Sequence, residues 1–232
     1  SHDEFSKLAE SYITWLEIGG SHAHKLRSLI EKIGLTTLVV TDIDCQDAAG
    51  SSTVPVRGTG LTTRNHTLKT WWPMLDQLDA LLDITEEEKA KHYEEERFTL
   101  RVAYQCPIEV TFKGTETEAL AYTLEDAVVV ANIDLFETLP GTGLIAKFRT
   151  AIVNSANFAA LSAALKDALK GGNKAEFALD LLEIETPAAL KPPKYIREGL
   201  LWLAEQLAHK QAELGLAPLQ AALATPAVAP AA

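Results

Sequence analysis

Residues 11–44 carry the pattern that most constrains the fold: a strand, a helix and a second strand in close succession. Residues 11–18 (SYITWLEI) alternate enough to read as a strand, and residues 35–44 (LTTLVVTDID) are apolar and β-branched, as a buried strand is. Between them, residues 21–33 carry an apolar stripe at helical spacing, with Ser21 as the expected N-cap. Parallel strands need such a helical crossover. The sequence therefore predicts an α/β fold with a mainly parallel sheet.

Two aspartates, Asp42 and Asp44, stand at the end of the second strand. Ligands of a parallel sheet bind at the carboxyl ends of its strands. Residues i and i+2 of an extended chain point to the same side, so we expect the two carboxylates to converge and to repel each other unless a cation lies between them. Mg²⁺ and Mn²⁺ prefer such oxygen ligands. The simpler alternative is that one aspartate caps the following turn and the other is solvated.

The net charge, the cysteine content and the hydropathy of the chain argue against several classes of protein. A net charge of −11 argues against a broad basic surface for nucleic acid, although an acidic metal site can still meet phosphates. The two cysteines, Cys45 and Cys106, form no CxxC pair and no disulfide framework. We find no apolar run long enough to cross a membrane, so a cytoplasmic protein without a membrane partner is expected.

The chain after the two aspartates divides into a mixed part and a helical part. The mixed part is expected to hold, in order, a loop at 48–63, helix over 66–97 with a solvated acidic face, strands at 97–102 and 108–112, and a helix from Thr123. The Ala- and Leu-rich part is expected to hold helices at 157–170, 174–185 and 194–214. The predicted domains are 1–136 with a mostly helical insertion at about 65–97, a helical domain at 137–216, and an Ala/Pro-rich tail at 217–232.

Five separated blocks resemble, in the same order, the C-terminal catalytic region of OLD-family (overcoming lysogenisation defect) nucleases. They are LEIGGSHAHKLRSLIEKIGLTTLVVTDID, TRNHTLKTWWP, YTLEDAVVVAN, NKAEFALDLL and PPKYIREGLLWL, and they cover most of residues 11–209. The resemblance implies a Toprim (Rossmann-like) domain with a helical insertion and an all-α C-terminal helical domain. In that family an ABC-type ATPase domain precedes these parts. Because the chain has no GxxxxGK[ST] motif, that domain and its ATP are expected outside this chain.

The resemblance also implies a function, a metal-dependent DNA endonuclease that cleaves phosphodiester bonds with two Mg²⁺ or Mn²⁺ ions. Asp42 and Asp44 match the Toprim metal ligands, and Glu125 matches a further acidic ligand. Thr123 stands where the family has a hydroxyl residue, and Lys174 matches its lysine near the scissile phosphate. The implied partners are DNA and the protein's own ATPase domain, with a homodimer left open. The implied source is bacterial or phage-type.

Other interpretations remain open. Thr123 could serve as an N-cap alone, and Glu125 could simply favour the helix dipole, whereas Lys174 is unfavourable at a helix start and so favours a functional role. Toprim domains also begin with a strand ending in glutamate; Glu17 lies in the block of the second strand, so we expect the chain to begin after the first. Without that ligand, a non-catalytic Toprim-fold regulatory or dimerisation module is the main alternative. A dehalogenase-like phosphatase, with Asp42 as nucleophile, is a further one.

Overall fold

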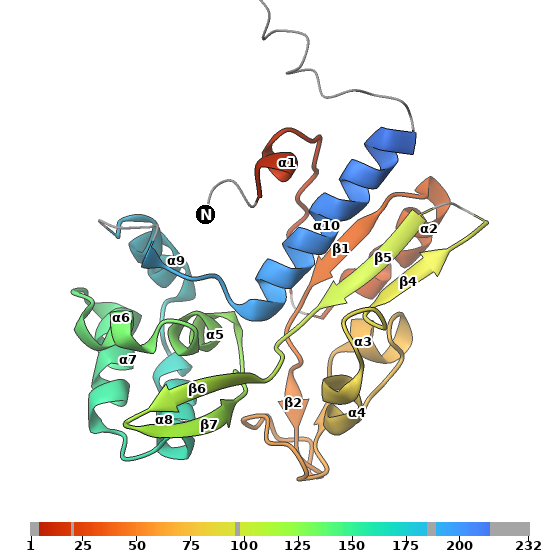
Figure 1. The fold of residues 1–232 in the computed structure, drawn as a ribbon. Coiled ribbons are helices and arrows are strands. Elements are labelled where there is room, and N and C mark those ends of the chain that lie inside the picture. Colours follow the sequence, from red (N-terminus) through yellow and green to blue (C-terminus); the bar gives the residue numbers. More distant parts are fainter. Residues whose placement is uncertain (1–4, 20, 96–97, 185–188, 214–232) are drawn as a thin grey trace, which may run out of the picture.

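The computed structural model describes residues 5–19, 21–95, 98–184 and 189–213. A sheet lies on one side of the molecule and a lobe of helices with a β-hairpin lies on the other (Figure 1). The strands are β1 (Thr37–Val40), β2 (Cys45–Gln46), β3 (Thr62–Thr63), β4 (Ala90–Tyr93), β5 (Phe98–Ala103), β6 (Ile108–Phe112) and β7 (Thr115–Ala119). The helices are α1 (Ser6–Ala9), η2 (Ala23–Leu26, a 3₁₀ turn), α2 (Arg27–Ile33), α3 (His66–Thr70), α4 (Leu78–Asp83), α5 (Leu124–Val130), α6 (Ile133–Thr138), α7 (Gly143–Asn154), α8 (Phe158–Leu169), α9 (Lys174–Leu182) and α10 (Lys194–Glu213).

The main sheet has the order β1-β5-β4. β1 pairs with β5 in parallel, with Thr37 opposite Leu100, and β4 pairs with β5 antiparallel. The α/β prediction and the strand before the two aspartates are confirmed. The central strand, β5, is buried along its whole length, including the polar Thr99 and the charged Arg101.

Side chains alternate between the two faces of this sheet. Val39, Leu100 and Val102 belong to a core that includes residues of α3 and α4. Leu38 and Ala103 belong to a second cluster, with Tyr195 at the start of α10. Helix α10 therefore covers one face, and α2, α3 and α4 contribute to the core on the other (Figure 1).

The expected strand over residues 11–18 is wrong. The structure has no regular element at those positions, and the side chains of Tyr12 and Trp15 are 96% and 72% exposed, so their alternation reflects no buried face. The parallel pair therefore joins β1 to β5. The helix after this segment is confirmed, but its first turn is 3₁₀ and Ser21 makes no cap for it.

The expected continuous helix over 66–97 is also wrong. The segment holds two short helices, α3 and α4, and then β4, where a solvated helix face was predicted. The apolar side of this acidic stretch is the cause, because Tyr93 stacks on Phe98 with ring centroids 4.3 Å apart and so favours the edge of the sheet. Strand β5 matches the expected strand except at Arg97, which lies outside the described residues.

The helical lobe has a core of its own. Apolar residues of β6, β7 and helices α5 to α9 pack together in it, including Phe112, Val129, Phe136, Phe148 and Phe177. The predicted helices that became α8, α9 and α10 are confirmed, and α7 was not predicted.

The predicted domain boundary between 136 and 137 stays a prediction, but the packing does not follow it. Strands β6 and β7 and helix α5 lie in the core of the lobe, while α10 packs against β1 and β5. The chain thus leaves the sheet after β5 and returns to it with α10. The predicted tail at 217–232 lies outside the described residues. Among the described helices, none combines the length and the apolar character that crossing a membrane requires.

Candidate functional site

All five residues singled out in the sequence line one cleft. The cleft has a volume of about 550 Å³ and opens where β1 ends, between the sheet and the helical lobe. Asp42 and Asp44 come from the segment after β1, Thr123 and Glu125 from the start of α5, and Lys174 from the start of α9. The other lining residues are Glu17, Ile18, Ser21, Val40, Thr41, Asn65, Tyr122, Leu124 and Tyr195. The structure therefore brings together side chains that are up to 132 residues apart, from Asp42 to Lys174.

Asp42 is half-buried in the segment that follows β1. Burial raises the pKa of its carboxyl group to about 6, a hydrogen bond from Gln105 opposes that rise, and the nearby charge of Glu125 adds to it. The Nε2 of Gln105 donates to Oδ1 of Asp42. The raised pKa means that nearby positive charge does not compensate for the burial of this carboxylate. A bound cation would stabilise its ionised form.

Asp44 reaches the cleft by a different geometry from the predicted one. Its backbone has a φ of 56°, in the left-handed region, so the chain is no longer extended there. Its carboxylate accepts a hydrogen bond from the Arg64 guanidinium at 2.6 Å, and its carbonyl accepts from the backbone N–H of Arg64 at 2.9 Å. The expected convergence of the two carboxylates on one cleft is found, but the alternation of an extended strand is not its cause.

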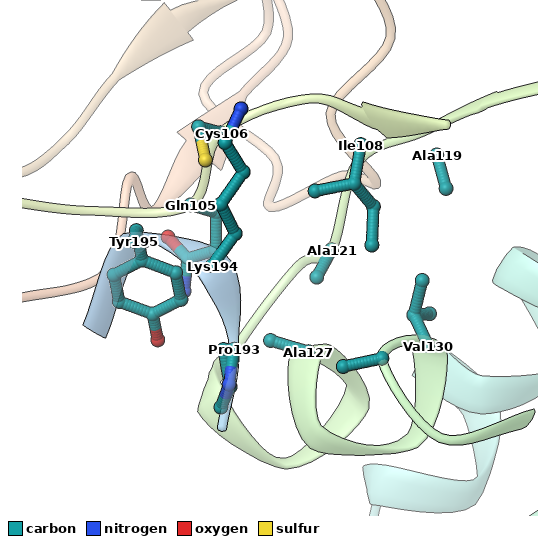
Figure 2. Close-up of a pocket in the computed structure, with 11 residues that line it drawn as sticks. Gln105, Cys106, Ile108, Ala119, Ala121, Ala127, Val130, Pro193, Lys194 and Tyr195 are labelled. Carbon is teal, nitrogen blue, oxygen red and sulfur yellow. The ribbon is translucent and has the colours of Figure 1, made fainter. Parts of the chain in front are cut away.

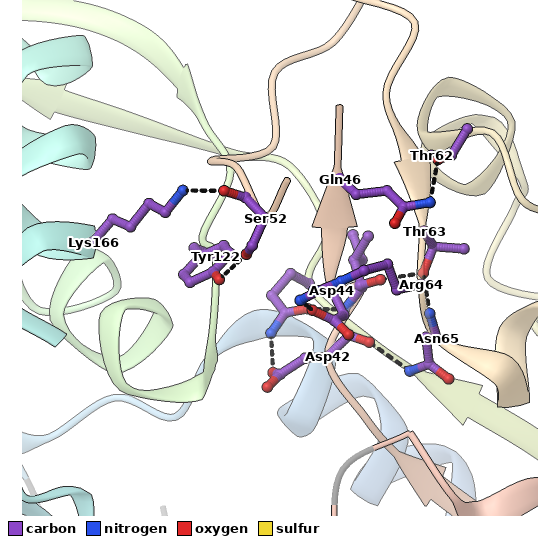
Figure 3. Close-up of polar contacts among 12 residues, drawn as sticks. Asp42, Asp44, Gln46, Ser52, Thr62, Thr63, Arg64, Asn65, Tyr122 and Lys166 are labelled. Carbon is purple, nitrogen blue, oxygen red and sulfur yellow. Dashed lines mark hydrogen bonds and ion pairs between the residues drawn. The ribbon is translucent and has the colours of Figure 1, made fainter. Parts of the chain in front are cut away.

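Side chains at the end of β3 and just after it hold the backbone of residues 41–44 in place (Figure 3). The buried Asn65 donates from Nδ2 to the carbonyl of Asp42 at 2.6 Å and to Oγ1 of Thr41 at 2.7 Å. Its Oδ1 accepts from the N–H groups of Thr67 and Leu68, so it is also the N-cap of α3. The Thr63 hydroxyl donates to the carbonyl of Ile43. The segment is thus fixed by several bonds rather than by sheet pairing.

The start of α5 places Thr123 and Glu125 on the opposite side of the cleft. The Asp126 carboxylate accepts hydrogen bonds at 2.6 Å from the backbone N–H groups of Tyr122 and Thr123, and the Thr123 hydroxyl donates to it at 2.7 Å. In the capping box this hydroxyl also accepts from the Asp126 N–H, so at most one of its lone pairs is left for the cleft. The helix start near Thr123 is confirmed, and Asp126 is its capping partner.

Glu125 and Lys174 form an ion pair on the helical-lobe side of the cleft. The Nζ of Lys174 lies 2.9 Å from Oε2 of Glu125, and the lysine side chain is about half exposed. Lys174 is the first residue of α9, where a positive charge opposes the helix dipole. The pair offsets that cost and keeps the lysine beside the acidic side chains.

The donor set fits a divalent cation in chemistry, though it is not a closed cage. Carboxylate and hydroxyl oxygens are hard ligands. In the part of the chain that the structure describes, no three His, Cys, Asp or Glu side chains lie close enough to hold one ion together. Mg²⁺ commonly keeps several waters and takes one or two carboxylates, so a site of this kind needs no larger set. The Arg64 and Lys174 partners would have to release Asp44 and Glu125 first.

Several residues of the site went unnoticed in the sequence. Gln105 follows the second parallel strand, β5, and so obeys the same rule of strand ends that pointed to Asp42. Glu17, which the sequence analysis placed in a strand and did not count as a ligand, also lines the cleft. Tyr195, at the start of α10, is buried and lines both this cleft and a small cavity of about 20 Å³ behind Gln105 (Figure 2). A buried tyrosine and a glutamine carry no motif that a single sequence reveals.

Comparisons with known proteins agree with this picture. Residues 2–44 match the family model described as the Overcoming lysogenization defect protein-like TOPRIM domain, a match that ends on Asp44. Over 220 residues the chain is 27% identical to a protein of Bacillus cereus (strain HuB5-5) named Endonuclease GajA. Both findings confirm the resemblance to OLD-family nucleases. The aligned part is 88% of this chain but 29% of the relative, so the chain spans less than a third of that protein's length. No solved structure matches the chain.

Proposed function

We propose that this chain is the catalytic region of a metal-dependent DNA endonuclease. The observation that carries the proposal is the single cleft that gathers Asp42, Asp44, Thr123, Glu125 and Lys174. The named function of the Bacillus cereus relative supports the same reaction class. As in the sequence-based expectation, the working site would hold two ions, and ATP would act only through a separate ATPase domain.

In this proposal Asp42, Asp44 and Glu125 hold Mg²⁺ or Mn²⁺, and Thr123 adds a hydroxyl oxygen. The ions supply Lewis acidity, which polarises a phosphoryl oxygen and makes water a better nucleophile. Lys174 leaves Glu125 and places its positive charge beside the phosphodiester, where negative charge develops during cleavage. Asn65 and Asp126 keep the two sides of the cleft in place through the hydrogen bonds that they make.

DNA docking needs more than this cleft, because the net charge is −11. Arg57 is paired with Asp83 at 2.5 Å and with Glu118 at 3.5 Å. Arg64 is paired with Asp44. We propose that most of the contacts with DNA come from the ATPase domain or from a second copy of the chain.

The test is a plasmid-nicking assay. Supercoiled plasmid is incubated with the protein, with Asp42→Ala and with Asp44→Ala, in Mg²⁺, Mn²⁺ or EDTA, using both this chain and any longer protein that contains it. We expect nicking that needs metal and is lost in both variants. Nicking that persists in EDTA or in the variants would contradict the proposal.

A regulatory or dimerisation module is the second candidate. The pairs Arg64–Asp44 and Lys174–Glu125 favour it, because a site without metal would be stabilised by just such internal cations. It predicts no nicking in any metal, together with a loss of stability when Arg64 or Lys174 is replaced by methionine.

A further inference from the structure

The three predicted acidic ligands differ in the partner that holds each one. Asp44 and Glu125 pair with Arg64 and Lys174, whose side chains are 41% and 51% exposed. Asp42 pairs with Gln105, which is neutral and only 1% exposed. An exposed cation can swing away when a metal ion arrives, whereas a buried neutral amide neither competes with the ion nor leaves.

Gln105 contacts the aspartate segment through both ends of its amide. Its Nε2 donates to Oδ1 of Asp42, and its Oε1 accepts from the backbone N–H of Ile43 at 2.8 Å. The orientation follows from chemistry, because a backbone N–H can only donate and must therefore face the amide oxygen. The amide nitrogen is then committed to Asp42. It can only donate, so the Asp42 oxygen that it meets is fixed as an acceptor.

The surroundings leave Gln105 little freedom. Tyr104 and Cys106 flank it at the end of β5, and Ala121, Ala127 and Tyr195 line the small cavity beside it (Figure 2). That cavity, about 20 Å³, has room for about one water molecule. Because Gln105 is buried, neighbouring side chains as well as its two hydrogen bonds hold its amide beside Asp42.

Asp42 gains an orientation from this clamp. Oδ1 is engaged by Gln105, while Oδ2 receives no hydrogen bond from the residues that the structure describes. The backbone on either side is fixed, since Asn65 holds the Asp42 carbonyl and Gln105 holds the Ile43 N–H. Such neighbours of metal ligands alter metal affinity by about 10- to 100-fold when replaced.

We infer that Gln105 is a positioning residue that presents Asp42 to the divalent cation as an oriented ligand. The inference rests on the proposed metal site and deepens it. It makes Asp42 the anchor to which an ion binds first, before Arg64 and Lys174 release the other two acids. Gln105 touches neither metal nor phosphate in this scheme and acts through Asp42 alone.

Two substitutions test this role. Gln105→Glu keeps an acceptor for Ile43 and removes the donor to Asp42, and Gln105→Met removes the donor without adding charge. The same two substitutions at Gln46 are matched controls, because its amide donates to Thr62 at 3.2 Å and does not contact Asp42. The dissociation constant for Mn²⁺ is measured by electron paramagnetic resonance, together with the thermal midpoint in EDTA and the plasmid-nicking rate across a series of Mn²⁺ concentrations.

We expect both Gln105 variants to bind Mn²⁺ at least about 10-fold more weakly than the unsubstituted protein. The two Gln46 variants should bind within twofold of it. Saturating Mn²⁺ should restore the nicking rate of Gln105→Glu to within a few-fold, because the ligands themselves remain. A merely structural role would lower the thermal midpoint without shifting the metal dependence.

The outcomes separate this inference from the proposed function. Mn²⁺ affinities within twofold for all variants, in a protein that binds Mn²⁺ and nicks DNA, would overturn the role of Gln105 alone. Weaker binding by both Gln105 variants in a protein that never nicks DNA would uphold that role and overturn the nuclease. An unsubstituted protein that does not bind Mn²⁺ would overturn both.

Discussion

Lys174 occupies a position where its own helix disfavours it, at the first residue of α9. Its ion pair with Glu125 offsets that cost. The two roles proposed for the lysine have opposite effects on metal binding and on cleavage. As a partner of Glu125 it competes with a metal ion. As a positive charge beside the phosphodiester it assists cleavage.

Replacing Lys174 by methionine should therefore have two effects of opposite sign. Mn²⁺ should bind a few-fold more tightly, because a competing cation is gone, while nicking at saturating Mn²⁺ should fall by at least about 10-fold. Lys170→Met is the matched control, since Lys170 pairs with Asp167 at 2.7 Å and both side chains are largely exposed. Metal affinity and nicking that fall together would mean that Lys174 serves only to hold the fold.

The individual residues of the cleft also show how much of the site could be predicted from the sequence. The place of Asp42 and Thr123 in the cleft could be predicted, because a strand end and a helix start leave local patterns. Gln105 also follows a predicted strand, but the sequence does not show that its amide meets Asp42, 63 positions away. The left-handed backbone of Asp44 was equally hidden, because the bond from the Arg64 N–H that accompanies it is made by the fold.

At the scale of elements, α10 approaches the sheet at Gly199. A Cβ atom at this position would lie 3.1 Å from Cβ of Ala103 on β5 and 3.1 Å from Cδ1 of Leu38 on β1. The close approach lets the helix cover the strands that lead to Asp42 and Gln105, and it brings Tyr195 to the cleft.

Gly199→Val should lower the free energy of unfolding by about 1–3 kcal/mol, because the added methyl groups must push the helix off the sheet. Glu205→Val, at an exposed position of the same helix, reports the cost of a β-branched residue alone. Urea unfolding at pH 7 measures both. If Gly199→Val lowers the free energy of unfolding no more than Glu205→Val does, the close contact at Gly199 adds no destabilisation of its own.

A second element-scale feature lies where β4 and β5 meet the turn before β4. The nearly buried Lys89 and Arg101 both pair with the carboxylate of Glu86, Lys89 at 2.5 Å. Burial acts to raise the pKa of Glu86, but the hydrogen bond from Lys89 and the charges of Lys89 and Arg101 outweigh it and hold that pKa below its usual range. Removing the carboxylate would leave two buried cations without their partner.

Glu86→Gln should therefore lower the free energy of unfolding by about 1 kcal/mol at pH 7. The loss is smaller than for a fully buried ion pair, because the Glu86 side chain is 40% exposed and solvent screens its charge. A lowered folded pKa stabilises the fold above the ordinary glutamate range, and that stabilisation is lost as the pH falls through the folded pKa. The difference from the unsubstituted protein should thus shrink below about pH 4. Urea titrations at several pH values measure it, with the exposed Glu87→Gln as control. An equal difference at every pH would rule out this ionic origin.

The two wrongly predicted elements share a cause at this scale. Residues 11–18 alternate like a strand, but a pattern of period two needs a partner strand and a buried face, and Tyr12 and Trp15 have neither. The acidic stretch before β5 has the composition of a helix, yet pairing with β5 and the stacking of Tyr93 on Phe98 override that propensity. Tertiary contacts decide both cases, and a single sequence does not reveal which residues make those contacts.

At the scale of the whole molecule, the cleft lies between two separately packed cores, one around the sheet and one in the helical lobe. Lys166 of α8 connects the two sides, since its Nζ donates to the Ser52 carbonyl at 2.6 Å and lies 5.2 Å from the centre of the Tyr122 ring (Figure 3). Tyr122 is bonded in turn to the Ser52 hydroxyl. A ligand that draws the two sides of the cleft together would therefore stabilise the molecule as a whole.

Metal binding should raise the global stability through this coupling. A ligand that binds only the folded state adds about 2.7 kcal/mol when present at 100 times its dissociation constant. We expect the thermal midpoint to rise with Mn²⁺ concentration, and the rise to disappear in Asp42→Asn and Asp44→Asn, which lose a charged ligand each. Asp167→Asn controls for the loss of a carboxylate elsewhere, because Asp167 lies on the exposed end of α8. A similar rise in all variants would mean that Mn²⁺ acts by general screening of the −11 net charge, and the acidic cleft would then hold no specific ion.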